Sequence, residues 1–262
     1  MKILVCVKQV PDTSEVKMDP ETNTLVRQGI PSIVNPFDKY ALEAALQLKD
    51  KHGGQVTVLS MGPAQAKDAL KECLAMGADD AILVSDRAFG GADTLATSYT
   101  LAAAVRKTGP YDLIFCGKQA IDGDTAQVGP ELAEHLDFAQ VTYVAGLAWR
   151  DGLILAQRER EDGYETIETK LPALFSIVKT AVFEPRLASV KGRLKANKAD
   201  IPVLGAADLD IEAQRIGLKG SPTQVRRIFT PPQRTQGVLI KKDTAREAAQ
   251  ELWEHLSKAN LM

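Results

Sequence analysis

The sequence has no long apolar run and almost no excess of either charge. Its 262 residues include 32 Lys and Arg against 34 Asp and Glu, a formal net charge of −2. The N-terminal run MKILVCVKQVPDT has only a few consecutive apolar residues, far fewer than the ~18 that a membrane span requires. We therefore expect a cytoplasmic protein without a signal peptide, a membrane span or a basic surplus for binding nucleic acid.

Cysteine and histidine are scarce. Cys6, Cys73 and Cys116 form no CxxC motif and have no His nearby, which predicts buried free thiols in a reducing compartment and no disulfide framework or metal site. The three His residues lie on predicted helices among charged residues. No nucleophile–base pair is evident, so we expect no catalytic side chain and infer that a bound cofactor carries any chemistry.

Standard phosphate-binding motifs are also missing. The chain has no GxxxxGK[ST] loop and no GxGxxG after its first apolar segment. It also lacks the Ser-Gly-Gly-x-Asp-Ser run of pyrophosphatase-type adenylating enzymes. A nucleotide site, if present, must be built in another way.

The segments that are present alternate between strand and helix patterns. At 45% hydrophobic and 25% charged residues, the composition is typical of a globular protein. Continuous apolar runs predict buried strands at residues 2–8, 55–61, 80–85 and 112–116. Helical spacing predicts helices from Pro36 to Gly53, from Pro63 to Gly77, from a cap at Asp93 or Thr94 to Gly109, and from a cap at Asp124 or Thr125 through Leu136.

The pattern changes after residue 141. Asp151-Gly152 and Asp162-Gly163 are hairpin signals between apolar segments at 141–149, 153–160 and 164–170, followed by a strand at 173–178. A short hairpin near Asn23 is a further possibility. From Glu184 the chain shows little periodicity until an amphipathic helix at 244–259. We expect this tail to lie on another polypeptide and not on its own core.

These patterns predict an α/β fold: a doubly wound, mostly parallel sheet with helices on both faces, an antiparallel hairpin extension and an extended C-terminal arm. We divide the chain into a nucleotide- or flavin-binding domain at 1–185 and a partner-recognition loop with the C-terminal arm at 186–262.

In open α/β sheets, ligands bind beyond the carboxyl ends of the strands. After the third strand, Gly90-Gly91 precede a helix start with Thr94 and Thr97, where backbone N–H groups and hydroxyls can hold a pyrophosphate. After the fourth strand, Gly123 lies between two Asp residues that can hold ribose hydroxyls. Each loop alone is also explained as a capping turn. Two such loops at adjacent strand ends predict a nucleotide.

At these residues the chain resembles the β subunit of an electron transfer flavoprotein. The resemblance rests on residues 1–13, on 35–43 (NPFDKYALE), on 117–124 (GKQAIDGD), on 170–173 (KLPA) and on 231–237 (PPQRTQG). It implies a heterodimer with an α subunit that carries FAD, while the β subunit holds AMP or, in the electron-bifurcating branch, a second FAD that accepts hydride from NADH. The stretches 85–94 and 123–130 resemble the bifurcating branch.

Two alternatives stay open. One is an ordinary, non-bifurcating β subunit that holds AMP. The other, from a different class, is a stand-alone adenine-nucleotide-binding regulatory module. The long C-terminal arm and the basic segment at 186–198 disfavour the stand-alone module, because a self-contained sensor needs no extended tail.

The resemblance also implies site residues. Candidate phosphate contacts are Gly90, Gly91, Thr94 and Thr97; candidate adenosine contacts are Cys6, Asn35, Asp38, Cys116, Gly117, Asp122, Thr125 and Gln127; and Tyr40, Asp86, Asp93, Gly123 and Ala126 complete the cofactor set. Val190, Lys191 and Arg193 resemble the loop with which β subunits grip an FAD-containing dehydrogenase. Ferredoxin or flavodoxin is the low-potential electron acceptor that the bifurcating branch implies.

Overall fold

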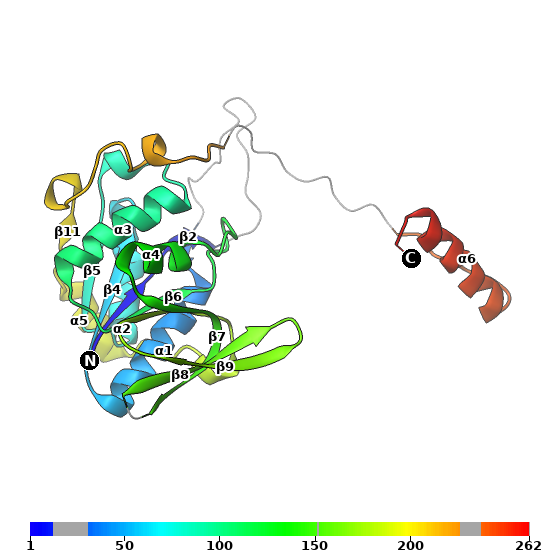
Figure 1. Ribbon diagram of the computed structural model, residues 1–262, viewed down its shortest axis with the longest axis horizontal. Coiled ribbons are helices and arrows are strands. Elements are labelled where there is room, and N and C mark those ends of the chain that lie inside the picture. The colour runs from blue at the N-terminus through cyan, green and yellow to red at the C-terminus, as the bar shows by residue number, and fades with distance from the viewer. Residues whose placement is uncertain (13–30, 151, 226–236, 262) are drawn as a thin grey trace. The chain divides into compact units, whose positions relative to one another are not determined.

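A computed structural model describes residues 1–12, 31–150, 152–225 and 237–261 of the chain. It forms two compact units, Met1–Arg226 and Arg227–Met262, which are considered separately below (Figure 1). The hairpin expected near Asn23 lies outside the described residues, as does most of the 231–237 motif. The division of function at residue 185 stays a prediction.

The first unit is built on a nine-stranded sheet with the order β11-β5-β4-β1-β6-β10-β7-β8-β9. Its strands are β1 (Lys2–Cys6), β4 (Gln55–Met61), β5 (Asp80–Val84), β6 (Leu113–Gly117), β7 (Ala139–Arg150), β8 (Leu153–Arg160), β9 (Gly163–Thr169), β10 (Ala173–Ile177) and β11 (Val203–Leu204). Neighbours from β11 to β7 run parallel, and β7, β8 and β9 pair antiparallel. A separate hairpin joins β2 (Gln9–Pro11) to β3 (Ser32–Val34).

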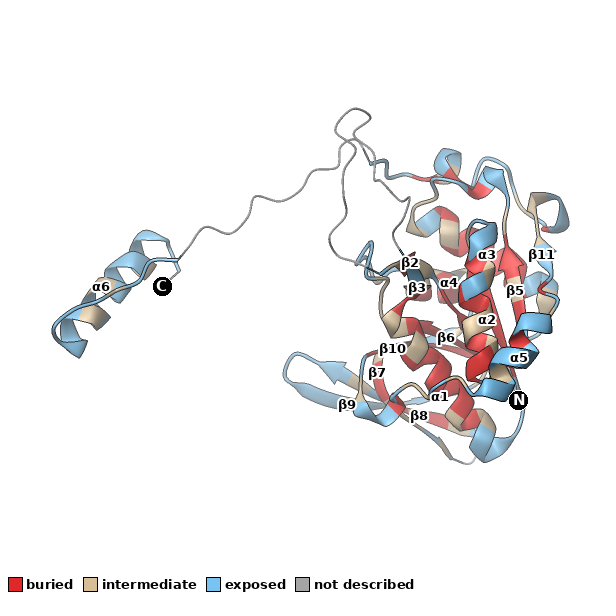
Figure 2. Ribbon diagram, turned by 180° about the vertical axis from the view of Figure 1, so that it is seen from behind, coloured by how far each residue is buried: buried red, intermediate tan, exposed pale blue. Residues whose placement is uncertain are grey.

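Helices cover both faces of this sheet (Figure 2). The helices are α1 (Pro36–His52), α2 (Lys67–Met76), α3 (Thr94–Thr108), α4 (Val128–Leu136) and α5 (Val190–Lys198), with short 3-10 turns η1 (Ala64–Ala66), η2 (Arg87–Phe89), η3 (Ala181–Phe183), η4 (Ala206–Asp208) and η5 (Leu218–Gly220). Alternate residues of β1 enter opposite cores: Ile3 and Val5 pack with α1 and α2, whereas Leu4 packs with α3 and α4. The predicted doubly wound, mostly parallel sheet is confirmed.

The strand β10 enters the sheet between two strands that precede it in the chain. It pairs in parallel with β6 on one side and with β7 on the other. The ring centroids of Phe115 on β6 and Phe175 on β10 are 5.7 Å apart in the core. The antiparallel strands β7, β8 and β9 are therefore joined to the parallel core by β10, a strand that follows all three of them in the chain.

Two expectations about local structure are wrong. Asp93 caps α3 as predicted, accepting a hydrogen bond from the Ala96 amide, but neither Asp124 nor Thr125 caps α4. The N-cap of α4 is Gln127, whose side chain makes no capping bond. In addition, the second predicted helix does not start at Pro63. Residues 64–66 form the 3-10 turn η1, and the helix α2 begins at Lys67.

The tail after Glu184 also departs from expectation. Residues 190–198 form the helix α5, and β11 pairs with β5 at the sheet edge. Ile201, Leu209 and Ile216 are buried in the cores of the first unit. This part of the tail packs on its own core and not on another polypeptide, because these apolar side chains fill gaps at the sheet edge and beside α3.

The second unit contains the helix α6 (Ala245–Lys258). The helix was predicted, but its capping box was not: the Thr244 hydroxyl accepts a hydrogen bond from the Glu247 amide, and the Glu247 carboxylate accepts one from the Thr244 amide. No residue of α6 is buried. Among the helices of the described ranges, none is both long and apolar enough to span a membrane.

Candidate nucleotide site

The switch point of the sheet lies between β1 and β6. From β1 the chain proceeds to β4 and β5 on one side, and after α3 it returns to β6 on the other side of β1. Cys6 and Cys116 are register partners at the carboxyl ends of β1 and β6. A doubly wound sheet binds its ligand in the crevice at this position.

A buried amide joins the two sides of this crevice. Asn35, fully buried at the start of α1, donates from Nδ2 to the Asp38 carboxylate (2.9 Å) and to the Gln119 carbonyl (2.8 Å). Its Oδ1 accepts from the Ile121 amide at 3.2 Å. Asn35 is the N-cap residue of α1, but its side chain makes no capping bond and instead fixes α1 to the loop after β6.

Asp38 is the second buried polar group of the crevice. Its carboxylate accepts a hydrogen bond from the Lys8 amide at 2.7 Å. Burial raises the pKa of Asp38 to about 7, against the opposing effect of the hydrogen bonds from Asn35, Lys8 and Gly117. This carboxyl group thus changes its charge near neutral pH.

Gly117 is required by the close approach of α1. A Cβ atom at this position would lie 2.3 Å from the Asp38 Oδ1 atom and 2.7 Å from the Phe37 carbonyl carbon. Any side chain would push the end of β6 away from the first turn of α1. The glycine therefore allows Asp38 to reach the backbone at this strand end.

The loop after β6 is exposed and locally strained. Asp124 and Ala126 adopt positive φ angles of 50° and 54°, a conformation that is uncommon outside glycine and asparagine. The Lys8 ammonium lies 2.8 Å from the Asp122 carboxylate, and Gln119 donates to Asp124 at 2.7 Å. Strained backbone held in this way is frequent at ligand sites.

Donor groups at the end of this loop are available. Within the described ranges, the side chains of Thr125 and Gln127 have no hydrogen-bond partner. The first turn of α4 has no side-chain cap; Pro130 has no N–H and the Glu131 amide donates to the Gln127 carbonyl at 3.0 Å, so the amides of Val128 and Gly129 are the donors that this turn offers to an anion. A Cβ on Gly123 would meet nothing within 4 Å.

The loop after β5 holds a later part of the chain, here called the strap (residues 205–223). The Asp86 carboxylate accepts from the Ala206 amide at 3.0 Å, and the Gly90 carbonyl accepts from the Leu218 amide at 2.9 Å. Gly91 has a φ of +73° and lies against Leu218. Asp93 accepts from both the amide (3.0 Å) and the hydroxyl (2.8 Å) of Thr223. Four predicted cofactor residues thus also anchor the strap.

The start of α3 faces a carboxylate that sequence reasoning missed. The Thr94 hydroxyl donates to Glu131 Oε1 of α4 at 3.1 Å, and Glu131 Oε2 is buried without a partner among the described residues. Burial raises the pKa of Glu131. The hydroxyl of Thr97 has no partner in the described part of the chain. No spacing in the sequence indicated that α3 and α4 would bring these groups together.

Three further predicted cofactor residues, Cys6, Cys116 and Tyr40, are buried. Cys6 and Cys116 are free, buried thiols, and the pKa of Cys116 is raised by its hydrogen bond to Cys6 and by burial. Tyr40 donates its hydroxyl to Glu184 Oε2 at 3.3 Å, and burial raises the pKa of the phenol. Its polar end is therefore engaged by the segment after β10.

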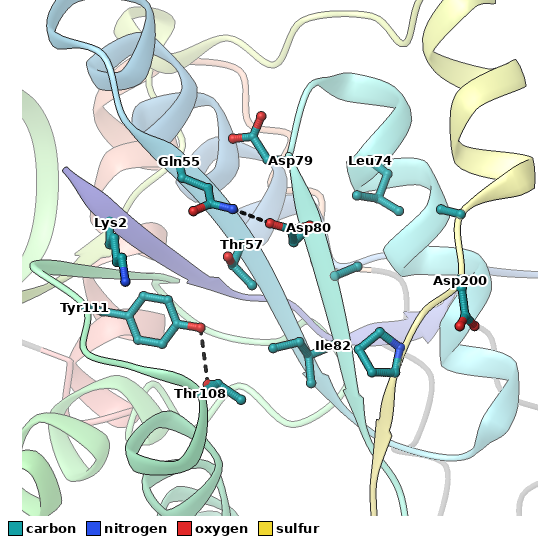
Figure 3. A pocket seen from close by; sticks show the side chains of 13 residues that line it. Lys2, Gln55, Thr57, Leu74, Asp79, Asp80, Ile82, Thr108, Tyr111 and Asp200 are labelled. Atoms are coloured by element: carbon teal, nitrogen blue, oxygen red, sulfur yellow. Dashed lines mark hydrogen bonds between the residues drawn. The ribbon is translucent and has the colours of Figure 1, made fainter.

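Two further hollows of the first unit lie elsewhere. One of about 450 Å³ is lined by Lys2, Gln55, Asp80, Tyr111 and Asp200 at the amino ends of the strands (Figure 3). Another of about 340 Å³ lies beside α3, where the Arg215 guanidinium stacks 4.0 Å over the Tyr99 ring. The residues that line these two hollows include none of the predicted cofactor residues.

The predicted docking residues lie mainly on a helix and not in a loop, which corrects the expectation. Ser189 caps α5 through the Gly192 amide (2.9 Å). Leu187, Val190 and Leu194 form what we call the docking stripe; their exposed fractions are 93%, 78% and 62%. Lys191 and Arg193 flank it and are exposed. Exposed apolar side chains in such a row are typical of a protein-binding surface.

Comparisons with known proteins match nearly the whole chain. A family model described as "Electron transfer flavoprotein domain" matches residues 22–209. "Electron transfer flavoprotein subunit beta" of Megasphaera elsdenii is 52% identical over 256 residues, covering 95% of this chain and 94% of the relative. "Caffeyl-CoA reductase-Etf complex subunit CarD" of Acetobacterium woodii is 50% identical over 263 residues, with all of both chains covered. "Acryloyl-CoA reductase electron transfer subunit gamma" of Anaerotignum propionicum is 46% identical over 269 residues, again with both chains fully covered.

Proposed function

The chain belongs to the electron transfer flavoprotein family as a β subunit, and we propose that it is of the electron-bifurcating type. In this proposal it pairs with an α subunit and binds FAD at the candidate nucleotide site. Bound FAD supplies hydride acceptance from NADH and one-electron transfer, to ferredoxin or flavodoxin on one branch and through the α-subunit FAD to a dehydrogenase on the other. The buried thiols suit a reducing compartment, and we place the protein in the cytoplasm.

The names of two relatives support the dehydrogenase branch. One is a subunit of a caffeyl-CoA reductase complex and the other an electron transfer subunit of acryloyl-CoA reductase. Both names join a subunit of this kind to a reductase that acts on a CoA thioester. We therefore infer an FAD-containing, acyl-CoA-type dehydrogenase as the partner.

The residues of the crevice fit an adenine nucleotide. Asn35, Asp38 and Gly117 hold the ends of β1 and β6 at a fixed distance from α1, which shapes the place for an adenosine. Thr125, Gln127 and the uncapped first turn of α4 offer donors for the first phosphate. Among the predicted cofactor residues, these form the set that AMP alone would need.

A second cluster favours FAD over AMP, and it is the observation that carries the proposal. Thr94 and Thr97 at the start of α3 provide hydroxyls that AMP would not require, while the backbone of Gly90 before them is engaged by Arg87 and Leu218. The Thr94 hydroxyl donates to the Glu131 carboxyl group at 3.1 Å, and burial raises the pKa of Glu131. A Cβ on Gly123 would meet nothing within 4 Å, so the proposal assigns the passage of the larger cofactor to this open position.

The flavin content of variants tests this proposal. Gly123→Gln places a long side chain in open space without disturbing the chain's own packing, and Thr94→Leu removes a phosphate donor. Each αβ complex should contain one FAD in place of two, measured by flavin absorbance after acid release. Gly123→Ala and Thr94→Ser are the matched controls and should keep two.

One result would contradict FAD binding, and a second would contradict its placement beside Gly123. The first is a wild-type complex with one FAD, and AMP in the extract, after reconstitution with excess FAD; the ordinary AMP-holding β subunit would then replace the proposal. The second is Gly123→Gln retaining both flavins. A stand-alone regulatory module would instead show no flavin and no α subunit on copurification.

A further inference from the structure

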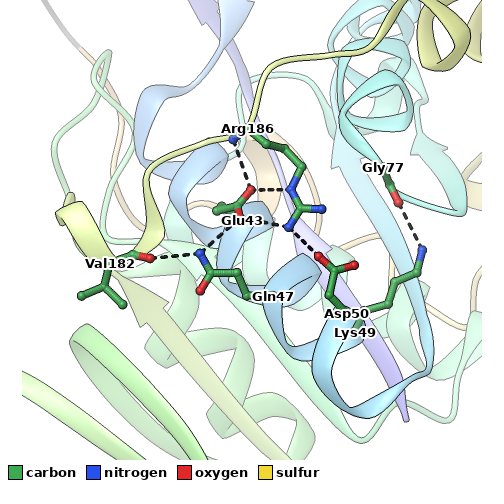
Figure 4. A network of polar contacts seen from close by, with 7 residues as sticks. All are labelled: Glu43, Gln47, Lys49, Asp50, Gly77, Val182 and Arg186. Carbon is green, nitrogen blue, oxygen red and sulfur yellow. Dashed lines mark hydrogen bonds and ion pairs between the residues drawn. The ribbon is translucent and has the colours of Figure 1, made fainter.

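The segment between β10 and α5 is held to the sheet by side chains of α1 (Figure 4). Apart from the 3-10 turn η3, residues 178–189 form no regular structure. Gln47 donates to the Val182 carbonyl at 3.0 Å, and Tyr40 donates to Glu184 at 3.3 Å. The position of this segment therefore depends on α1.

The strongest of these contacts joins Arg186 to Glu43. The guanidinium donates from Nε to Glu43 Oε2 at 2.8 Å and from Nη2 to Oε1 at 3.0 Å, and the Arg186 backbone amide also donates to Oε2 at 3.2 Å. A further bond reaches Asp50 at 2.8 Å. The hydrogen bonds to Glu43 raise the pKa of Arg186. One buried carboxylate thus fixes both the side chain and the backbone of Arg186.

The docking stripe begins at the next residue. Leu187 follows Arg186 directly, and Val190 and Leu194 continue the stripe on α5. The helix itself is fixed against α2, because a Cβ on Gly192 would lie 2.3 Å from the Ala75 carbonyl oxygen and Ala196 is buried. The stripe is therefore held at two places, by Arg186 before it and by the α2 contact within it.

We propose that Arg186 is the positioning residue of the docking stripe: through Glu43 it holds the stripe in the shape that the dehydrogenase binds. The proposal rests on the proposed function, which assigns dehydrogenase binding to Val190 and its neighbours. A surface that is already ordered loses less conformational entropy on binding. Arg186 thereby strengthens docking without contacting the partner.

The test is electron transfer from the αβ complex to purified caffeyl-CoA reductase of Acetobacterium woodii and acryloyl-CoA reductase of Anaerotignum propionicum. Arg186→Gln should raise the apparent KM for the reductase about three- to tenfold. The kcat at saturating reductase and NADH oxidation by an artificial acceptor should not change. Hydrogen exchange of residues 184–189 should become faster.

Two further variants separate positioning from folding. Arg186→Gln leaves the Glu43 carboxylate buried and unpaired, which destabilises a protein strongly. The double variant Glu43→Gln/Arg186→Gln has no such charge and should show the same rise in KM. Arg160→Gln is the matched control. Arg160 also pairs with two acidic side chains, Asp162 and Glu165, but it lies at the end of β8, in the hairpin that β8 forms with β9.

The possible failures are distinguishable. If Val190→Asp raises the KM and neither Arg186 variant does, the docking surface stands and the role of Arg186 is wrong, even where hydrogen exchange becomes faster. If Val190→Asp also leaves the KM unchanged, the docking assignment itself fails. An equal fall in kcat and in artificial-acceptor activity in the double variant would mean that Arg186 is a general structural residue.

Discussion

At the residue scale, the crevice depends on polar groups that do not face solvent. Asn35 and Asp38 are both buried, and they contact Lys8, Gln119 and each other. Their role in the described structure is to set the distance between α1 and the ends of β1 and β6. Thr125 and Gln127 are exposed, and their side chains have no hydrogen-bond partner among the described residues. The residues that set the shape of the crevice are therefore different from those proposed to bind the nucleotide.

We predict that Asp38 makes the stability of the complex depend on pH. Its pKa rises from 3.8 to about 7 on folding, so the folded state retains a proton that the unfolded state loses. The resulting stabilisation is complete below about pH 4 and is lost as the pH rises to about 7, by about 1.4 kcal/mol per pH unit at most. Asp38→Asn removes this dependence.

Chemical denaturation of the αβ complex between pH 5 and pH 8 checks the prediction. The free energy of unfolding of Asp38→Asn minus that of the wild type should increase from pH 5 to pH 7 and then level off. Glu131→Gln is the comparison, because burial also raises the pKa of Glu131 but that residue is only partly buried. The change with pH should be smaller for Glu131→Gln than for Asp38→Asn. A difference that is flat across the whole range contradicts the assigned titration.

At the scale of elements, the strands and helices that could be predicted are those whose apolar residues recur at a regular spacing in the sequence. The strands of the parallel core, α1, α3 and α6 follow from apolar spacing, and the turn between β8 and β9 was predicted one residue late, because Gly163 is already part of β9. The helix α5 escaped prediction because its apolar side chains are exposed and Gly192 lies within it. The strap escaped because its buried residues, such as Leu209 and Ile216, are single side chains without a period.

The same limit applies to the candidate site. The loops at the strand ends could be identified from composition and topology, but the contacts within them could not. The contact between Thr94 and Glu131 joins two helices, and the engagement of Asp93 by Thr223 joins residues 130 positions apart. Such long-range side-chain pairs leave no local pattern in a single sequence.

We predict that Val190→Asp on α5 weakens docking and nothing else. Val190 is largely exposed, so an Asp there does not disturb the folded chain, but a charge buried in an apolar contact is unfavourable. Electron transfer to the reductase should fall at least tenfold, while flavin content and NADH oxidation by an artificial acceptor stay unchanged. Val225→Asp, at a similarly exposed apolar position, is the control. Equal loss of both activities would show a structural role.

At the scale of the whole molecule, one unit has a core, and the described helix of the other unit buries no residue. The first unit buries the sheet and five α-helices, whereas α6 in the second unit buries no residue. Leu252 and Trp253 on α6 are about half exposed, and Val238 and Leu239 before it are more so. Apolar surface of this kind in a helix with a capping box fits a partner subunit.

We therefore predict that the chain made without an α subunit aggregates or is unstable. Coexpression with the α subunit should give a stable heterodimer on size-exclusion chromatography, because the partner covers the apolar side chains. Removing residues 227–262 should reduce aggregation of the isolated chain and abolish heterodimer formation. A monodisperse, thermally robust full-length chain in isolation would contradict the heterodimer.

The position of β10 between β6 and β7 has a consequence for the protein during its synthesis. The strand β6 is complete at Gly117, but its neighbour β10 begins only at Ala173, roughly fifty residues later. At about 5–20 residues per second, a ribosome needs roughly 3–10 s to make that stretch. Throughout this time the nascent chain displays β6 as an open edge, and β7 is the first strand able to pair with it wrongly. The sheet thus reaches its native order only when the ribosome has passed the hairpin, and the speed of translation across residues 118–177 sets how long the mispaired arrangement is accessible.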